Sequence, residues 1–180
     1  GDVGAIIEQI IASWKKNKYS IDNDALSSWW QKINEWKKID CLSFQQSGES
    51  IKPQYAIQRL YELTKNKNTI ITTEVGQHQM WAAQYYKFEK PNKWITSGGL
   101  GTMGFGFPAA IGAQVAYPDA LVVDIAGDGS ILMNIQEMST VVQHRLPVKI
   151  FIINNEYMGM VRQWQELLHG GRYSESYMDS

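Results

Sequence analysis

The sequence predicts an α/β fold, a three-layer α/β/α sandwich in which helices cover both faces of a largely parallel sheet. From residue 53 onward, short β-branched runs alternate with stretches whose apolar residues recur every three or four positions. These spacings are typical of strands and helices respectively. The short runs lack period-two alternation, which favours strands buried on both faces. Because helices separate the strands, we expect consecutive strands to run parallel.

The elements of the main domain can be assigned in order. Pro53 suits the first turn of a helix, and apolar residues follow it on one broad face. The expected strands are residues 69–75, 94–96, 121–125 and 148–153. The expected later helices are residues 77–86, 107–116, 131–144 and 158–168. Ligands of such sheets bind beyond the carboxyl ends of the strands, so we expect functional residues where strands hand over to helices.

Residues 1–50 are expected to form a helical linker segment, and residues 51–180 the main domain. Apolar residues at helical spacing predict one amphipathic helix around residues 6–14 and a second over residues 27–38. Residues 40–50, rich in Ser, Gln and Gly, are typical of a connector. Large aromatic side chains are usually packing anchors rather than ligand-stacking groups. We therefore expect a packing role for the tryptophans of this segment, Trp14, Trp29, Trp30 and Trp36.

Composition and charge exclude several classes of function. With 17 basic and 18 acidic side chains the formal charge is -1, so no global field recruits nucleic acid or an anionic membrane. No apolar run approaches the ~20 residues that span a bilayer. The single cysteine, Cys41, cannot form an internal disulfide, which suits the cytoplasm or an organelle matrix. Residues 1–4 lack a methionine and the features of a signal peptide, so we expect a piece of a longer protein.

The strongest functional signal is the run D-I-A-G-D-G-S at residues 124–130, between an expected strand and an expected helix. Gly127 and Gly129 let the backbone turn sharply and approach a ligand, and the N–H groups that open the next helix can bind a phosphate. Asp128 supplies a carboxylate oxygen, which Mg²⁺ prefers and commonly shares with bound phosphates. The alternative is a plain glycine turn in which Asp128 or Ser130 caps the helix.

Asn154 and Asn155 follow the next expected strand. Neighbouring parallel strands end side by side, so the amide oxygen of Asn155 can reach a cation held by Asp128. Taken alone, consecutive asparagines are ordinary turn residues. A Gly-Asp-Gly turn, a helix, a strand and an asparagine pair in this order form the signature of thiamine diphosphate enzymes. The combination therefore favours a bound cation and a diphosphate.

A second glycine-rich run, residues 99–104, fits the spacing of a dinucleotide-binding fingerprint. That fingerprint expects an acidic residue closing a later strand, whereas Asp119 follows Pro118 and precedes its strand. We favour a glycine turn that lets the backbone approach a flat ligand ring.

The chain resembles the C-terminal cofactor-binding domain of the acetohydroxyacid synthase (acetolactate synthase) catalytic subunit. The resemblance covers about residues 51–179. It rests on separate blocks in the same order, namely T-E-V-G-Q-H-Q-M-W at residues 73–81 and residues 97–108, 127–130 and 154–164. It implies the thiamine diphosphate-binding form of the three-layer fold.

The resemblance also implies a set of metal and diphosphate ligands. Magnesium would be bound by the side chains of Asp128 and Asn155 and by the main-chain oxygen of Tyr157. The diphosphate would be contacted by Gly129, Ser130, Gln77 and His78. The alternative for His78 is a buried structural role.

Further roles follow from the resemblance for the rest of the cofactor and the substrate. The backbone of Gly101 and Met103 would contact the aminopyrimidine ring, and Met160 would hold the cofactor in a bent shape. Trp164, next to Gln163, would line the channel through which the second substrate enters. Met160 and Trp164 could instead be core residues.

In the resembled family, pyruvate loses CO₂ on thiamine diphosphate, and the carbanion attacks a second pyruvate or 2-oxobutyrate. The products, 2-acetolactate and 2-aceto-2-hydroxybutyrate, lead to branched-chain amino acids. The catalytic glutamate comes from an N-terminal domain across a dimer interface, and FAD lies largely in a middle domain. The resemblance thus implies a homodimer or tetramer of full-length chains, a regulatory small subunit as a further partner, and an isolated piece that is inactive.

Two other interpretations stay open at this point. The first is another thiamine diphosphate enzyme, of the glyoxylate carboligase or pyruvate oxidase type. The second is a non-catalytic assembly domain whose aromatic N-terminal helices dock a partner.

Overall fold

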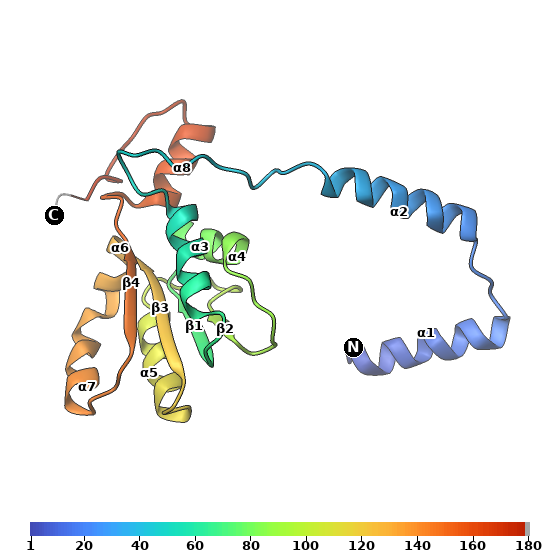
Figure 1. The fold of residues 1–180 in the computed structure, drawn as a ribbon, viewed down its shortest axis with the longest axis horizontal. Coiled ribbons are helices and arrows are strands. Elements are labelled where there is room, and N and C mark those ends of the chain that lie inside the picture. Colours follow the sequence, from blue (N-terminus) through green and yellow to red (C-terminus); the bar gives the residue numbers. More distant parts are fainter. Residues whose placement is uncertain (179–180) are drawn as a thin grey trace. The chain divides into compact units, whose positions relative to one another are not determined.

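A computed structural model describes residues 1–178, so residues 179 and 180, at the end of the expected main domain, lie outside the described residues. The chain forms two compact units, Gly1–Ser43 and Phe44–Ser180 (Figure 1). Each unit is described by itself below. Among the described residues, no helix combines the length and the apolar character needed to cross a membrane.

The first unit contains helices α1 (Val3–Asn17) and α2 (Asn23–Lys37). An aspartate caps the start of each, because the Asp2 side chain accepts from the Ala5 N–H and the Asp22 side chain accepts from the N–H groups of Asp24 and Ala25. The cap at Asp22 explains why α2 begins earlier than residue 27, where the apolar pattern placed it. Neither helix has a buried residue.

The expectation that the tryptophans of this unit are packing anchors is wrong within the described chain. Trp14, Trp29, Trp30 and Trp36 are each about half exposed. Trp29 and Trp36 meet edge to face, with ring centroids 5.6 Å apart. The apolar spacing therefore shows where the helices form, but these helices bury no core of their own.

The second unit is built on one four-stranded sheet in the order β2 (Trp94–Thr96), β1 (Thr69–Thr73), β3 (Leu121–Gly127), β4 (Lys149–Ile153). All three strand pairs are parallel, which confirms the predicted sheet. The residues of β1 are all buried, as are those of β3 after Leu121. β4 ends the sheet and is less covered; its Ile152 is 47% exposed, so burial on both faces holds only for the two inner strands.

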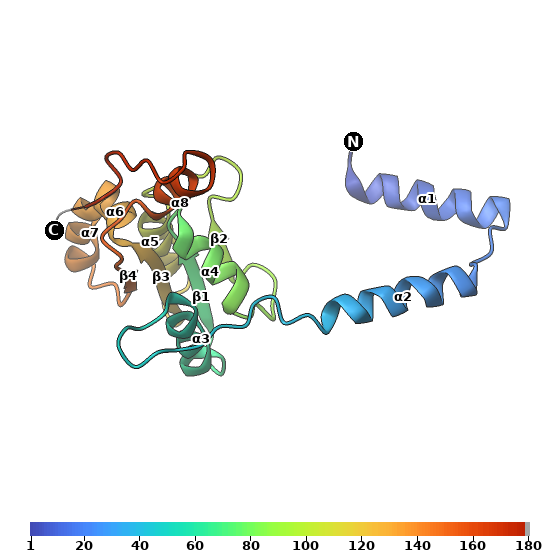
Figure 2. The ribbon, with the colours of Figure 1, turned by 90° about the horizontal axis from the view of Figure 1, so that it is seen from above.

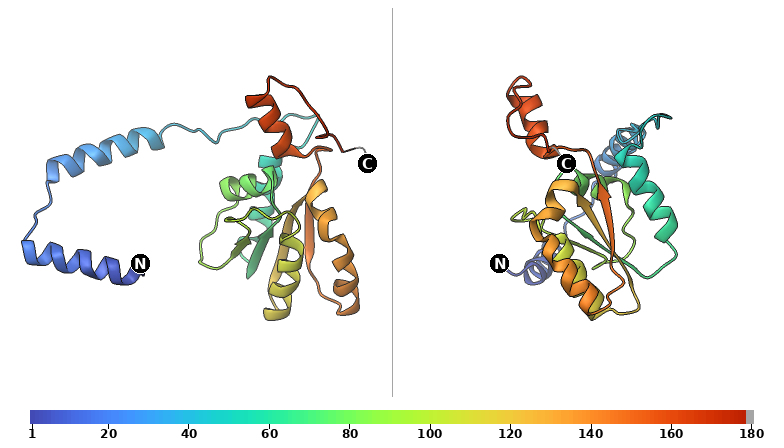
Figure 3. Two further views of the ribbon diagram at one scale, coloured as in Figure 1. Left: turned by 180° about the vertical axis from the view of Figure 1, so that it is seen from behind. Right: turned by 90° about the vertical axis from the view of Figure 1, so that its left-hand side faces the viewer.

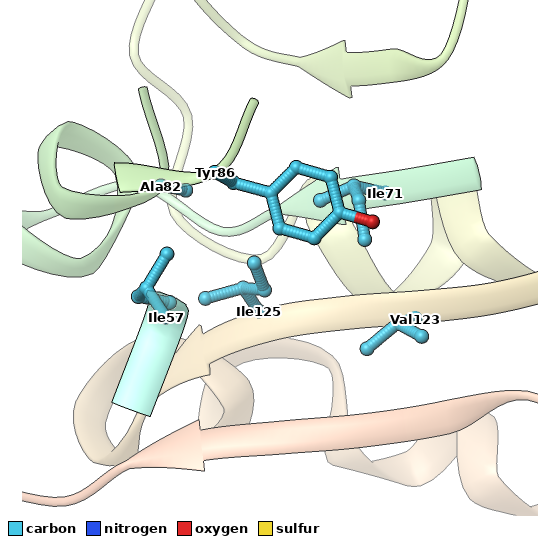
Figure 4. Close-up of a cluster of buried hydrophobic side chains, with 6 residues drawn as sticks. All are labelled: Ile57, Ile71, Ala82, Tyr86, Val123 and Ile125. Atoms are coloured by element: carbon cyan, nitrogen blue, oxygen red, sulfur yellow. The ribbon is translucent and has the colours of Figure 1, made fainter. Parts of the chain in front are cut away.

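Helices cover both faces of this sheet, as predicted (Figure 3). The helices α3 (Pro53–Thr64) and α4 (Gln77–Tyr85) pack on one face, where Ile57 and Tyr86 meet β1 and β3 (Figure 4). The other face carries α5 (Gly106–Ala116), whose Ala110 and Ala113 allow close approach to the strands. Full burial of a larger aliphatic side chain such as Ile57 stabilises the fold by roughly 1.5–3 kcal/mol.

The single helix expected over residues 131–144 is wrong. The segment divides into α6 (Asp128–Ile131), a 3-10 helix (Leu132–Glu137) and α7 (Met138–Gln143). The break lies at Asn134, whose backbone is not helical (φ -136°, ψ 30°). Its side-chain Nδ2 donates to the carbonyl of Gly104 at 2.6 Å. A tertiary hydrogen bond thus interrupts a pattern that is locally helical.

The last helix, α8 (Gly159–Leu168), follows β4 after a short turn and lies beyond the carboxyl end of the sheet (Figures 1 and 2). It begins at the point where the other polar turns converge. The site described next is built at this end.

Candidate functional site

A narrow cavity lies where β3 and β4 hand over to the segments that follow them. The register pairs Gly127 with Ile153, so the turns that begin at Asp128 and Asn154 are neighbours. The cavity has a volume of about 70 Å³ and is lined by most of the predicted site residues. They are Gln77, His78, Met103, Asp128, Gly129, Ser130, Asn155, Tyr157 and Met160.

Two predicted site residues do not line this cavity. Gly101 lies in the neighbouring glycine turn in a left-handed conformation (φ +68°), where glycine is strongly favoured. Trp164 is on α8 and is 53% exposed. Gln163 lines an adjoining hollow of about 340 Å³ together with Gln77 and Asn155.

Asp128 is held by the turn that follows β4. Its Oδ2 accepts from the Glu156 N–H at 2.8 Å, and the side chain of Asn154 accepts from the same N–H at 3.0 Å. Glu156 is in a left-handed conformation (φ 58°). Among the described residues, Oδ1 of Asp128 has no hydrogen-bond partner, which leaves one carboxylate oxygen available for a cation.

Asn155 and Tyr157 present two further oxygens in the same turn. Oδ1 of Asn155 accepts from the Tyr157 N–H at 3.2 Å and keeps a second lone pair. Tyr157 forms an antiparallel bridge with Tyr177, and the bridge bonds run between the flanking residues, from Met158 N–H to Ser176 and from Met178 N–H to Glu156. The carbonyl of Tyr157 therefore points away from the Tyr177 segment, on the side of its own N–H.

The side chain of Arg162 packs against the turn that contains Tyr157. Its guanidinium carbon lies 4.0 Å from the ring centroid of Tyr157 and 5.0 Å from that of Tyr173. Its Nε donates to Glu166 at 3.0 Å. The sequence alone had indicated no role for Arg162; the structure shows it as a support for the Tyr157 turn.

His78 is a buried, neutral imidazole at physiological pH. It is 6% exposed, and burial lowers its pKa from 6.5 to about 4, although a hydrogen bond to the Glu74 backbone opposes this. Its Nε2 lies 3.5 Å from Ser130 Oγ. A Cβ at Gly127 would lie 2.8 Å from Nδ1 of His78, so the glycine leaves room for this ring. His78 can thus offer a neutral N–H or an acceptor nitrogen, but no positive charge.

The opposite wall joins α4 to α8. Nε2 of Gln77 donates to Oε1 of Gln163 at 2.9 Å. A Cβ at Gly159 would meet the side-chain amide of Gln77 and would lie 3.1 Å from Nδ2 of Asn155. A side chain at this position would therefore crowd two polar side chains, those of Gln77 and Asn155, at the start of α8.

Two methionine sulfurs lie close to Gly129, and one of them belongs to Met158, which lines the cavity. A Cβ at this glycine would lie 2.7 Å from the sulfur of Met178 and 2.8 Å from that of Met158. The volume of about 70 Å³ is well below the roughly 300–1,000 Å³ typical of small-molecule sites. The cavity therefore encloses less space than a whole small-molecule ligand occupies.

Sequence reasoning missed a pair of buried carboxylates beneath the glycine turn. Glu74 is fully buried, and its carboxylate accepts from Gly104 N–H at 2.6 Å and from Phe107 N–H at 2.8 Å. Asp124 is also fully buried; its Oδ1 accepts from Thr72 at 2.8 Å, while Oδ2 has no partner among the described residues. The sequence did contain a signal for this pair, because one acidic residue stands in each of two otherwise apolar strand regions.

Burial makes both carboxyl groups hard to ionise. It raises the pKa of Glu74, although the backbone N–H groups of Phe107, Gly104 and Gly106 oppose the shift. Burial also raises the pKa of Asp124 to about 7, with the Thr72 bond opposing and the negative charge of Glu74 adding to the shift. The titration of Asp124 therefore lies near neutral pH rather than near its usual acidic range.

These shifts lead to a prediction for the pH dependence of stability. Asp124 keeps its proton in the folded state between pH 3.8 and about 7, so its contribution to stability falls as pH rises through this window. His78 is neutral when folded between pH 4 and 6.5 but protonated when unfolded, so its contribution rises over that window. Asp124→Asn removes the falling contribution, so its stability should change with pH more positively than that of the parent, by up to about 1.4 kcal/mol per pH unit.

Urea unfolding at a series of pH values between 4 and 7 measures this difference. Asp119→Asn, an exposed position near the start of β3, is the matched control and should keep the flatter profile of the parent chain. Identical profiles for Asp124→Asn and the control would contradict the assignment.

Among the described residues, no group of three or more His, Cys, Asp or Glu side chains could hold a metal ion. The oxygens gathered at this cavity instead come from one carboxylate, one amide and a carbonyl. Carboxylate and neutral oxygens are ligands that suit Mg²⁺ when it also binds phosphate.

Comparison with known proteins assigns the chain to a family. A family model described as "Thiamine pyrophosphate enzyme, C-terminal TPP binding domain" matches residues 74–180. The chain is 49% identical to the acetolactate synthase isozyme 3 large subunit of Escherichia coli (strain K12), covering all of this chain and 31% of that protein. It is 54% identical over 164 residues to acetolactate synthase 1, chloroplastic, of Nicotiana tabacum, covering 91% of this chain and 24% of that protein.

Proposed function

The chain belongs to the thiamine pyrophosphate enzymes, whose C-terminal TPP-binding domain it contains, and we propose that it supplies the diphosphate and magnesium half of an acetolactate synthase site. The observation that carries this proposal is the convergence of Asp128, Asn155 and the Tyr157 turn at one cavity. The chain spans less than a third of the curated relatives named above. We therefore propose the activity for a longer protein that includes this chain.

We assign the cation to oxygens of this turn. Asp128 Oδ1, Asn155 Oδ1 and the carbonyl of Tyr157 are the proposed magnesium ligands. Their support is the free carboxylate oxygen, the second lone pair of the amide, and the orientation of the carbonyl away from the Tyr177 segment. Phosphate oxygens and water would complete the octahedron that Mg²⁺ prefers.

We assign the diphosphate to the turn after β3. Gly129 and Ser130 would bind it, with Gln77 and His78 contacting it from the start of α4. The neutral state of His78 suits a hydrogen bond to phosphate rather than an ion pair, so the charge of the diphosphate would be balanced by the cation. Met103 and Met160, which also line the cavity, would hold the rings of the cofactor, together with the backbone of Gly101.

When bound, thiamine diphosphate supplies a nucleophilic carbon and an electron sink for decarboxylation. The residues of this chain bind and orient it. Glu74 holds the glycine turn by accepting from the N–H groups of Gly104 and Phe107, so the backbone that would face the aminopyrimidine is fixed. Trp164, exposed on α8, is the proposed residue of the substrate channel.

The remaining parts of the proposed enzyme lie outside these 180 residues. We propose that the longer protein uses pyruvate and 2-oxobutyrate, binds FAD, and assembles as a homodimer or tetramer with a regulatory small subunit. Cys41 as the single cysteine supports a reducing compartment such as the cytoplasm or an organelle matrix. The isolated chain is proposed to be inactive.

Product analysis of the longer protein tests the proposed function. With pyruvate, thiamine diphosphate and Mg²⁺, the expected product is 2-acetolactate, and addition of 2-oxobutyrate should give 2-aceto-2-hydroxybutyrate. Tartronate semialdehyde from glyoxylate, or acetyl phosphate from pyruvate, would identify a different thiamine diphosphate enzyme. Acetolactate formation by the 180-residue chain alone would contradict its proposed inactivity.

The channel role of Trp164 predicts a selective effect in the same assay. Trp164→Leu should change the ratio of the two products at equal substrate concentrations by roughly tenfold, a size typical of discrimination by one methylene in an apolar pocket. Leu168→Ala, a second exposed apolar position of α8, is the control and should leave the ratio unchanged. An unchanged product ratio in Trp164→Leu would contradict the proposal that the Trp164 indole lines the channel.

A further inference from the structure

A second cavity lies at the opposite end of the sheet, where β1 and β2 begin. It has a volume of about 370 Å³, and its walls come mainly from residues 64–69 at the end of α3 and from residues 86–90 and Lys93 before β2. It shares no lining residue with the cavity beside Asp128. Because the strands are parallel, one cavity lies at their amino ends and the other at their carboxyl ends.

The lining of this second cavity is rich in positively charged donors. Five lysines contribute to it, namely Lys65, Lys67, Lys87, Lys90 and Lys93. The ion pairs of the described chain are Arg59–Glu62 and Arg162–Glu166, so none of these lysines has an acidic partner there. Among the described residues of the lining, Glu89 is the only carboxylate, and its Oε1 accepts from the hydroxyl of Tyr61 at 2.9 Å. The cavity thus carries a local positive charge in a chain whose formal charge is -1.

The walls are joined by hydrogen bonds below the lysines. The hydroxyls of Thr64 and Tyr86 are 2.8 Å apart in the interior. Thr69 Oγ1 donates to the carbonyl of Thr64 at 3.1 Å, and Lys93 Nζ donates to Asn68 Oδ1 at 2.6 Å. The two loops are therefore fixed to each other before any ligand arrives, which lowers the entropy cost of binding.

We propose that this cavity, here called the lysine cavity, binds a small anion that carries two or more linked phosphate groups. Five lysines line one cavity without an acidic partner among the described ion pairs, and a ligand with several negative oxygens can be attracted to more than one of them at once. The amides of Asn66 and Asn68 add neutral donors to the same wall. The volume lies within the range of small-molecule sites.

The aromatic residues of the lysine cavity indicate that the phosphate chain, not a base, is recognised. Phe88 packs between Tyr86 and Trp94, with ring centroids 4.9 Å away in each case. The ring of Tyr61 meets that of Tyr86 edge to face and lies 5.9 Å from Nζ of Lys87. Because these rings are occupied by one another or by a lysine, inorganic tripolyphosphate and a nucleoside triphosphate should bind alike.

Calorimetric titration of the 180-residue chain with tripolyphosphate, without Mg²⁺ and at low salt, tests the proposal. The double variant Lys65→Gln, Lys90→Gln removes two exposed ammonium groups and should weaken binding by roughly tenfold or more. Lys15→Gln, Lys16→Gln removes the same charge from α1 and should bind as the parent does. ATP should match tripolyphosphate, and adenosine should not bind.

Further outcomes distinguish binding in the lysine cavity from binding elsewhere on the chain. Asp128→Ala should leave tripolyphosphate binding unchanged, so failure of the proposed magnesium site would not affect this result. Equal weakening in both lysine double variants would show only general charge attraction and would overturn the proposal. Loss of tripolyphosphate binding in Asp128→Ala would also overturn the proposal. The same holds if tripolyphosphate does not bind to the parent chain, or if an unphosphorylated acidic peptide binds as tightly as tripolyphosphate does. Circular dichroism of each variant confirms that it is folded.

Discussion

Asp128→Ala is expected to remove the magnesium-dependent binding of thiamine diphosphate, lowering the affinity by a hundredfold or more. The variant loses the only carboxylate of the proposed ligand set, and even the loss of residues that merely orient metal ligands typically lowers affinity by roughly 10–100-fold. It also removes one of the two acceptors of the Glu156 N–H, the other being the Asn154 side chain, so the turn after β4 loses one of its anchors. Calorimetric titration of the cofactor with and without Mg²⁺ measures the change.

Glu156→Ala is the matched control for Asp128→Ala. Glu156 contributes a carboxylate to the same turn, but it contacts Asp128 through its backbone N–H, which alanine retains. The control should therefore bind the cofactor like the parent chain. Equal heats of cofactor binding for the parent chain and Asp128→Ala would contradict the assignment of Asp128 as a magnesium ligand.

Gly106→Ala is expected to lower the free energy of unfolding by at least about 3 kcal/mol, the upper range for forced overpacking. A Cβ at this position would clash with Asp124 Oδ1 and would lie 2.5 Å from the Glu74 nitrogen and 2.6 Å from the Thr73 carbonyl carbon. Two of these atoms are backbone atoms of β1 and the residue that follows it. The clash therefore cannot be relieved by turning a side chain, and α5 would have to move away from the sheet.

Gly112→Ala, on the same helix, separates this clash from helix propensity. Apart from the neighbouring residues and nearby backbone of α5 itself, no atom of the described residues lies within 4 Å of a Cβ built at Gly112. Because alanine favours helix over glycine by about 1 kcal/mol, this variant should be slightly more stable than the parent. Urea unfolding of both variants gives the comparison. A Gly106→Ala protein as stable as Gly112→Ala would show that α5 packs less tightly on the sheet than described.

The sheet and most of the candidate site were predictable because their signals are local. The segment from Gly127 to Ser130 is contiguous, and parallel strands bring the following turns together without further information. The apolar runs predicted both ends of β2 correctly. They predicted the ends of β1 and β3 to within two residues. These are features that depend on neighbours in the sequence.

The features that escaped prediction depend on contacts between distant residues. Asn134 breaks a helical pattern only because its side chain reaches the Gly104 carbonyl, and no local signal reports this. The buried carboxylates Glu74 and Asp124 come from adjacent regions of the sheet but lie far apart in the sequence. The four N-terminal tryptophans were expected to be packing anchors, but they are half exposed in the structure. The spacing of apolar residues predicts a helix, but it does not show which surface that helix packs against.

The open side of β4 has a practical consequence for handling this chain. No strand pairs with the outer edge of β4 among the described residues, and Ile152 is exposed beside that row of free backbone groups. An uncovered, apolar edge strand is a template for pairing with another molecule. The 180-residue chain should therefore self-associate as its concentration rises, and Ile152→Lys, which places a charge beside that edge, should improve its solubility.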